Sequence, residues 1–249
     1  MDFLFNLRQF FLSVFRIFLS PAKNNLDCVV CGKCCRLIPV CKECQEKFFA
    51  VQPIDENLCE KCGKKLISEK GKCMECRGQG VLKNLDRAFP IFSYRLWNTE
   101  LLCRWKLECE RSLSPFFSRI LKVRLEQILA MFGKVSFVPV PPRPGKIKKE
   151  GWDQIEELSL FLEHRYGFSM DRILGRKSSV QQKTLGRDGR LKTIGSAYFV
   201  KDGFSPVPER ICVIDDVMTT GSTLEGIAGV LKEKGAQAVF AVTLFTVDS

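Results

Sequence analysis

Histidine is almost absent from this chain. Among 249 residues the only histidine is His164, although there are thirteen cysteines. Ten of these cysteines fall between Cys28 and Cys76, so a metal ion held in that segment must use sulfur ligands alone. Four thiolates complete the tetrahedral shell of zinc and leave no position for water or substrate. The composition therefore excludes a catalytic zinc in this segment and favours structural zinc.

The sequence also lacks a charge-free apolar run long enough to cross a membrane. Arg8 and Arg16 interrupt the apolar N-terminus, and Asp2 stands where a secretion signal carries positive charge. The polar residues of this segment recur at steps of three and four, which predicts an amphipathic helix over residues 1–22, ended by Pro21. We expect this helix to dock on the body of the protein. The alternative is a helix that binds a membrane surface or a partner.

The cysteines are spaced for metal binding rather than for disulfides. A two-residue spacer points two sulfurs at one ion, and this spacing occurs four times. The eight cysteines concerned are Cys28, Cys31, Cys41, Cys44, Cys59, Cys62, Cys73 and Cys76. They predict two structural Cys₄ zinc ribbons in a module spanning residues 28–80, with the knuckles paired in sequence order or interleaved. Cys34 and Cys35 are spare thiols or alternative ligands.

This module has little aliphatic sequence for a core, so we expect it to need metal in order to fold. Thiolates kept for metal also indicate a reducing compartment, and we expect a cytoplasmic protein.

Positive charge is concentrated in the middle of the chain. The net charge is +11, and residues 77–210 carry 25 Lys and Arg against 14 Asp and Glu. Such a surface suits a polyanion such as pyrophosphate, a phosphorylated sugar or nucleic acid. The alternative is an ordinary solvated basic surface.

The apolar pattern after the cysteine module predicts an α/β domain over residues 81–249. Residues 81–133 have mainly helical spacing. Later segments alternate between short buried strands and helices, which indicates parallel βαβ units. The expected strands cover residues 135–140, 210–217 and 238–245, and the expected helices cover residues 152–166 and 222–234.

A phosphate-binding pattern follows the strand predicted at residues 210–217. Asp215 and Asp216 stand at its carboxyl end, where ligands bind in open α/β sheets. Their carboxylates suit the hydroxyls of a sugar and Mg²⁺. The turn that leads into the next helix offers hydroxyls and free backbone N–H groups to a phosphate. Its residues are Thr219, Thr220, Gly221, Ser222 and Thr223.

The segment of residues 213–223 resembles the phosphoribosyl-pyrophosphate signature of type I phosphoribosyltransferases. Nearly the whole chain resembles the ComF (ComFC) family, whose plan is an apolar N-terminal helix, a double zinc ribbon and a phosphoribosyltransferase-like domain. Three further segments carry this resemblance, namely residues 139–154, residues 182–198 and residues 102–107 with Lys106. Two positions depart from the family pattern: Glu150 replaces an arginine and Thr193 replaces an asparagine.

The resemblance implies a reaction in which a nucleophile displaces pyrophosphate at the anomeric carbon of phosphoribosyl pyrophosphate. Asp215 and Asp216 would be the catalytic pair, holding the ribose hydroxyls and Mg²⁺, and Thr219 to Thr223 would hold the 5′-phosphate. The pyrophosphate side would be lined by Arg143, Lys146, Lys148 and Lys149. Lys183, Arg187 and Arg190 would belong to a lid, or to a solvated loop.

The sequence leaves more than one class of function open, because it contains no recognisable hood segment that would bind a nucleobase. The ComF family is associated with natural competence and DNA uptake, which implies competence proteins as partners. One hypothesis is a transferase with an unknown acceptor, and the other is a DNA-handling scaffold that binds single-stranded DNA and senses a ligand. Aromatic residues near the basic segment would stack bases or form core; they are Phe89, Phe92, Tyr94, Trp97 and Trp105. A zinc-ribbon adaptor is a third alternative.

Overall fold

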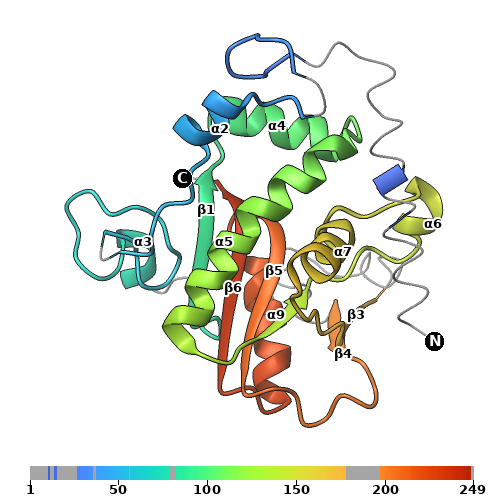
Figure 1. The fold of residues 1–249 in the computed structure, drawn as a ribbon. Helices are drawn as coiled ribbons and strands as arrows, with labels where there is room; N and C mark the ends of the chain where they lie inside the picture. The colour runs from blue at the N-terminus through green and yellow to red at the C-terminus, as the bar shows by residue number, and fades with distance from the viewer. Residues whose placement is uncertain are drawn as a thin grey trace, which may run out of the picture.

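A parallel sheet of four strands forms the centre of the computed structural model (Figure 1). The structure describes residues 11, 14–15, 27–35, 38–55, 57–78, 82–177 and 197–247. The strand order is β1-β6-β5-β2, and every neighbouring pair is parallel. The strands are β1 (Arg87–Ser93), β2 (Ser136–Pro139), β5 (Arg210–Met218) and β6 (Ala238–Thr246). The predicted α/β fold with a parallel sheet is confirmed.

Both faces of the sheet are covered, which explains why its strands are nearly continuous apolar runs. On β5, Cys212 and Ile214 join the core on one face, whereas Ile211 and Val213 join the core on the other. Figure 1 shows α5 crossing the near face and α9 behind the sheet. The helices of the first core are α4 (Trp97–Lys106), α5 (Ser114–Phe132) and α7 (Gln154–Tyr166), and the helix of the second is α9 (Ser222–Glu233).

Residues 81–133 are mainly helical, as expected, but their first part contains a strand. Arg87–Ser93 is β1, which pairs with β6 in the register Phe89↔Val242. A short apolar run of this kind fits a buried strand or a helix equally well by pattern alone. The segment is a strand because it pairs with β6, which lies far along the chain. The remainder contains α4, a short 3₁₀ helix (η2, Arg111–Leu113) and α5.

Three small elements that follow α5 in the chain were not predicted. The loop rich in proline and lysine contains α6 (Lys146–Glu150), and the polar segment after α7 contains the antiparallel strands β3 (Leu174–Arg176) and β4 (Tyr198–Val200). Each has five residues or fewer, so none is long enough to show a period in the sequence.

The two cysteine units pack in different parts of the core. The first unit, with α2 (Lys42–Phe48), joins the core of α4 and α5, where the rings of Phe49 and Phe116 lie 5.4 Å apart. The second unit, with α3 (Met74–Arg77), joins the core that α9 covers. In Figure 1 the first unit lies at the top, near α4, and the second lies at the left, beside β1.

The second unit covers the free edge of β1. The Ala88 amide donates to the Lys61 carbonyl at 2.8 Å. Gly63 (φ +70°) approaches β1 so closely that a Cβ there would lie 2.4 Å from Pro90 Cδ. An uncovered edge strand is a template for unwanted pairing. The second cysteine unit therefore stabilises the sheet at this edge.

Most of the helix expected over residues 1–22 lies outside the described residues. Of that segment, Phe11, Val14 and Phe15 are helical, and Phe11 and Phe15 are each 61% exposed. Within the described part of the chain, no helix is both long and apolar enough to traverse a bilayer.

Candidate functional sites

The eight predicted cysteine ligands form two clusters. Cys28, Cys31, Cys41 and Cys44 make one, and Cys59, Cys62, Cys73 and Cys76 make the other, with all sulfurs of a cluster within 4.8 Å of one another. This is the pairing in sequence order. The Cys31–Cys41 and Cys62–Cys73 sulfurs are each 3.7 Å apart. A tetrahedron with Zn–S bonds of about 2.3 Å has edges of about 3.8 Å, so the clusters fit zinc.

Backbone groups support the thiolate form in both clusters in the same way. The Cys41 amide donates to Cys28 Sγ and the Cys73 amide donates to Cys59 Sγ, each at 3.4 Å. Burial raises the pKa of these thiols, but backbone N–H donors outweigh it and lower the pKa of Cys28 to about 6 and of Cys59 to about 7. Cys34 and Cys35 lie outside both clusters.

A cavity of about 810 Å³ opens at the carboxyl ends of β2 and β5. We call it the β5 cavity. Predicted site residues from three segments meet there, because parallel strands end at one edge of the sheet. Those that line it are Asp215, Asp216, Thr219, Thr223, Arg143 and Lys146. The walls do not include Thr220, Gly221, Ser222, Lys148 or Lys149.

The turn after β5 has the form that its sequence predicts. Gly221 precedes α9 with φ 77° and ψ 0°, a left-handed conformation that favours glycine. A Cβ at this position would lie 2.7 Å from Leu82 Cδ2. Thr220 Oγ1 and Ser222 Oγ are hydrogen bonded at 2.8 Å. Thr219 and Thr223 flank this pair and line the cavity.

The two aspartates are close and only partly neutralised. Asp216 is 9% exposed, and its Oδ2 lies 2.5 Å from Lys106 Nζ on α4. Burial, together with the charge of Asp216, raises the pKa of Asp215 to about 8. Carboxylate oxygens are ligands that Mg²⁺ prefers, and a bound divalent cation would offset the repulsion that keeps Asp215 protonated. The donor set therefore fits Mg²⁺.

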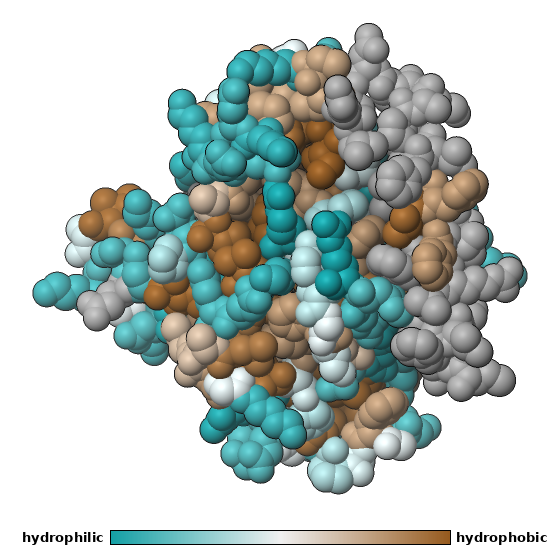
Figure 2. Space-filling model, in the orientation of Figure 1, coloured by the Kyte–Doolittle hydropathy of each residue, from teal (hydrophilic) through white to brown (hydrophobic). Residues whose placement is uncertain are grey.

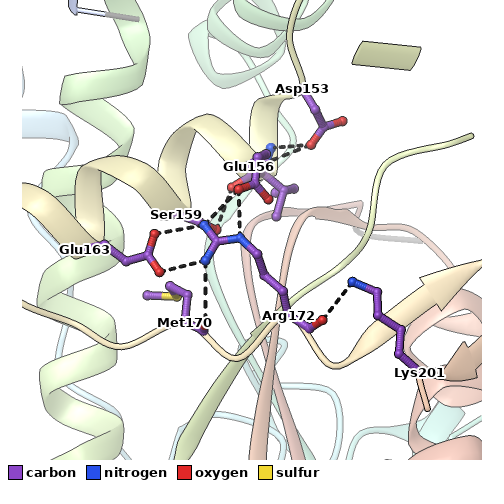
Figure 3. Close-up of polar contacts among 8 residues, drawn as sticks. Asp153, Glu156, Ser159, Glu163, Met170, Arg172 and Lys201 are labelled. Carbon is purple, nitrogen blue, oxygen red and sulfur yellow. Dashed lines mark hydrogen bonds and ion pairs between the residues drawn. The ribbon is translucent and has the colours of Figure 1, made fainter. Parts of the chain in front are cut away.

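The cations predicted for the pyrophosphate side of the cavity differ from one another in their contacts. Lys146 Nζ is 2.7 Å from Asp153 Oδ2 and also donates to Gln154. Asp153 is the N-cap of α7, and its Oδ1 accepts from the amides of Ile155 and Glu156 (Figure 3). Lys146 thus braces the start of α7. Lys148 and Lys149 are exposed on α6 and do not line the cavity. Of the two predicted cations in the cavity wall, Lys146 is paired with Asp153, and Arg143 has no ion pair among the described residues.

Sequence reasoning did not assign Arg176 to the site and named Tyr198 only as part of the stretch that resembles the ComF family; the two residues are paired across β3 and β4. The Arg176 guanidinium lies over the Tyr198 ring, 5.2 Å from its centroid, and both residues line the β5 cavity. Figure 3 shows how the segment before β3 is held: the Arg172 guanidinium bonds both oxygens of Glu163 and one of Glu156 on α7. No sequence signal marks Arg176, because its place depends on an antiparallel pair of three-residue strands.

The expected lid and the aromatic residues expected to stack bases have different outcomes. Lys183, Arg187 and Arg190, the expected lid, lie outside the described residues. Among the aromatic residues, Phe89 and Trp105 are buried and belong to the core, whereas Tyr94 lines the β5 cavity. Stacking of bases on Phe89 or Trp105 is therefore excluded.

Comparison with known proteins gives three curated relatives, although no family model matches the chain. Competence protein ComFC of Streptococcus pneumoniae is 27% identical over 210 residues, covering 82% of this chain and 86% of that protein. Competence protein ComFC of Bacillus subtilis is 25% identical over 218 residues, covering 83% and 82%. Competence protein F of Haemophilus influenzae is 23% identical over 206 residues, covering 80% and 87%.

The chain is thus similar, over at least 80% of its length, to three competence proteins named ComFC or F, in agreement with the ComF resemblance of its motifs.

Proposed function

We propose that this protein binds phosphoribosyl pyrophosphate with Mg²⁺ and acts as a phosphoribosyltransferase-like protein in competence-associated DNA uptake. The competence role is carried over from the names of its relatives. The binding proposal depends on one observation: the acidic pair Asp215–Asp216 and the hydroxyls of Thr219 and Thr223 share the β5 cavity with Arg143.

Each part of the ligand has a matching group in this proposal. The N–H groups at the start of α9 and the hydroxyls of Thr219 and Thr223 bind the 5′-phosphate. Asp215 and Asp216 accept hydrogen bonds from the ribose hydroxyls and hold Mg²⁺, which when bound neutralises charge on departing pyrophosphate. Arg143 and Arg176 lie where cations would stabilise the same leaving group.

Lys106 gains a role that its sequence position alone does not suggest. Its ammonium lies 2.5 Å from the Asp216 carboxylate. This contact orients the carboxylate toward the cavity and offsets part of its charge before a ligand arrives. The acceptor of the phosphoribosyl group stays open, and a pyrophosphate-release assay against candidate nucleophiles is the way to find it.

A second candidate function is a DNA-handling scaffold that uses the β5 cavity for ligand sensing. The observation in its favour is the exposed pair Lys148 and Lys149 on α6, close to the cavity wall at Lys146 and Glu150. Single-stranded DNA that bound there would contact the protein through its phosphates.

Calorimetry with phosphoribosyl pyrophosphate and Mg²⁺ tests the binding proposal. Replacing both Asp215 and Asp216 by Asn should weaken binding by roughly 1.5–3 kcal/mol for each charge-assisted hydrogen bond removed. Stability should change little, because Asn keeps the volume and the relief of repulsion between the carboxylates offsets the loss of the Lys106–Asp216 ion pair. Asp202→Asn, an exposed acid in the turn after β4, is the matched control and should bind as the wild type does.

Equal affinity in the wild type and the double Asn variant would show that the two acids do not hold the ribose. Loss of affinity together with unfolding would show instead that their role is structural. Absence of binding in the wild type at millimolar ligand would remove the phosphoribosyl proposal itself.

A further inference from the structure

A second cavity, of about 780 Å³, lies between the two cysteine units, β1 and α5. We call it the ribbon cavity. It shares no lining residue with the β5 cavity. The two are nevertheless neighbours, because Ser93 and Thr246 line the ribbon cavity while the next residues, Tyr94 and Val247, line the β5 cavity.

Arg124, on α5, is the unusual feature of the ribbon cavity. It is only 2% exposed, yet it lines the cavity. Its Nε and Nη1 atoms have no hydrogen-bond partner, and no ion pair joins it to another described residue. Burial lowers the pKa of this guanidinium to about 10, so it is still charged near neutral pH. A buried charge without a partner is costly and needs an explanation.

Thr246 supplies a second unpaired group at the same place. It ends β6, is 5% exposed, and its Oγ1 has no hydrogen-bond partner within the described structure. Its hydroxyl can donate to an acceptor in the cavity. Two buried donors of this kind, from an arginine and a threonine that line one cavity, both lack the acceptor that a ligand would bring.

The remaining walls indicate what kind of ligand fits. Arg95 and Lys65 add positive charge, and Lys64 beside them is already paired with Glu75 at 3.0 Å. Asp55 is the single acidic residue among the lining residues. Asp55 already accepts a hydrogen bond from the Asn57 amide at 2.9 Å. The apolar part of the wall is made by Pro53, Leu58, Ile67, Pro90, Ile91 and Phe92. Positive polar groups on one side and apolar groups on the other suit an anion with a partly apolar body.

We infer that the ribbon cavity is a second ligand site, which binds a small molecule through a phosphate or carboxylate group held by Arg124 and Thr246. The planar guanidinium offers paired N–H donors that match either oxyanion, and the Thr246 hydroxyl donates to a further oxygen. The site is separate from the one proposed for phosphoribosyl pyrophosphate and does not depend on it.

Thermal unfolding in the presence of inorganic phosphate or succinate tests this site. In the wild type we expect the midpoint to rise by about 3–6 °C at ten times the dissociation constant of the better anion. Arg124→Met should lose this gain, apart from any part that arises from phosphate in the β5 cavity. Without anion, Arg124→Met should melt at least about 2 °C higher than the wild type, because it removes a buried unpaired charge.

Arg119→Met is the matched control, since Arg119 lies on the same helix but is exposed. It removes one positive charge and should keep the full gain. The difference between the two variants therefore isolates the ribbon cavity from the β5 cavity. If phosphate gives the greater Arg124-dependent rise in melting midpoint, the ligand of the ribbon cavity is phosphorylated. If succinate gives the greater rise, the ligand is a carboxylate.

The inference is overturned if neither anion stabilises the wild type, or if Arg124→Met and Arg119→Met respond equally. Should Arg124→Met fail to fold, Thr246→Val gives an independent test. It preserves shape and removes only the hydroxyl, and it should weaken the anion-induced gain without lowering the midpoint in anion-free buffer.

Discussion

At the scale of single residues, the environment of Asp215 sets the chemistry of the β5 cavity. Asp215 and Asp216 are adjacent in sequence, yet the Lys106 ion pair is with Asp216. Asp215 is left with burial and a neighbouring negative charge, and both raise its pKa. An acid held partly protonated in a cavity is typical of functional sites.

This pKa makes a prediction about stability and pH. The folded pKa of Asp215 is about 8, above the ordinary value of 3.8. Between these values the folded protein binds more protons than the unfolded chain, so the free energy of unfolding should fall as pH rises. The slope is at most about 1.4 kcal/mol per pH unit. Urea unfolding of the Mg²⁺-free wild type and of Asp215→Asn, between about pH 6 and 8, measures it.

The difference between the two proteins is the informative quantity, since any pH dependence of the cysteine clusters is common to both. The wild type should lose stability relative to Asp215→Asn as pH rises. Parallel curves would mean that Asp215 is ionised throughout this range, and that solvent or another cation offsets its burial.

At the scale of elements, α6 separates two kinds of lysine that the sequence presents as one basic cluster. Lys146 points inward and is paired with Asp153, so its loss would disturb the start of α7. Lys148 and Lys149 are exposed and accessible to a polyanion. A test of DNA binding should therefore change only the exposed pair.

If single-stranded DNA binds at α6, its affinity should fall steeply with salt in the wild type. Lys148→Ala combined with Lys149→Ala should reduce the salt slope by up to about 1.4, at roughly 0.7 for each phosphate that is no longer neutralised. Fluorescence anisotropy of a labelled oligonucleotide at several salt concentrations measures the slope. Lys70→Ala with Lys72→Ala, a pair of lysines on the second cysteine unit, is the control with equal charge loss.

An equal decrease in the salt slope of both double variants would show that DNA binding depends on the overall charge of the protein rather than on α6. No binding at low salt would remove the direct DNA-binding hypothesis and leave the transferase proposal or a role through partners.

At the scale of the whole molecule, the cysteine module and the sheet depend on each other. The first unit contributes Cys28, Val40, Cys44 and Phe49 to the core of α4 and α5. The second hydrogen bonds to β1 and exposes apolar side chains, Ile67 and Met74, at its own surface. In Figure 2, brown hydrophobic residues lie among hydrophilic ones at the left of the view, where Figure 1 places the second cysteine unit.

Metal removal should therefore affect the sheet at one edge. We expect two Zn²⁺ per reduced chain by elemental analysis, one for each cluster. Chelation should unfold the module and expose the Ala88 amide, which is bonded to Lys61, to hydrogen exchange. Amides of the central strand β5 should stay protected.

Single substitutions give the matched comparison for metal content. Cys59→Ser should lower the zinc content toward one equivalent, whereas Cys103→Ser, outside both clusters, should leave two. Less than one equivalent in the reduced wild type would overturn the assignment of two zinc sites. Loss of hydrogen-exchange protection throughout β5 on chelation would show that the sheet does not stay folded without the module.

The sequence by itself determined the features that are written in short, local patterns. The C-x-x-C spacing identified all eight members of the sulfur clusters, because two residues of spacing bring two thiols to one point. The strand, turn and helix at residues 210–233 were equally local: an apolar run, a glycine in the left-handed region and an amphipathic helix.

Only the tertiary structure decided which distant residues meet. β1 is a strand because β6 pairs with it. Lys146 stabilises the start of α7 because it forms an ion pair with Asp153. Lys106, Arg176 and Asp215 share a cavity although they lie on three separate elements. The unpaired state of Arg124 is likewise invisible in sequence, where it is one basic residue on a helix. Burial and charge pairing are properties of the packed chain, and they arise only when segments far apart in sequence come into contact.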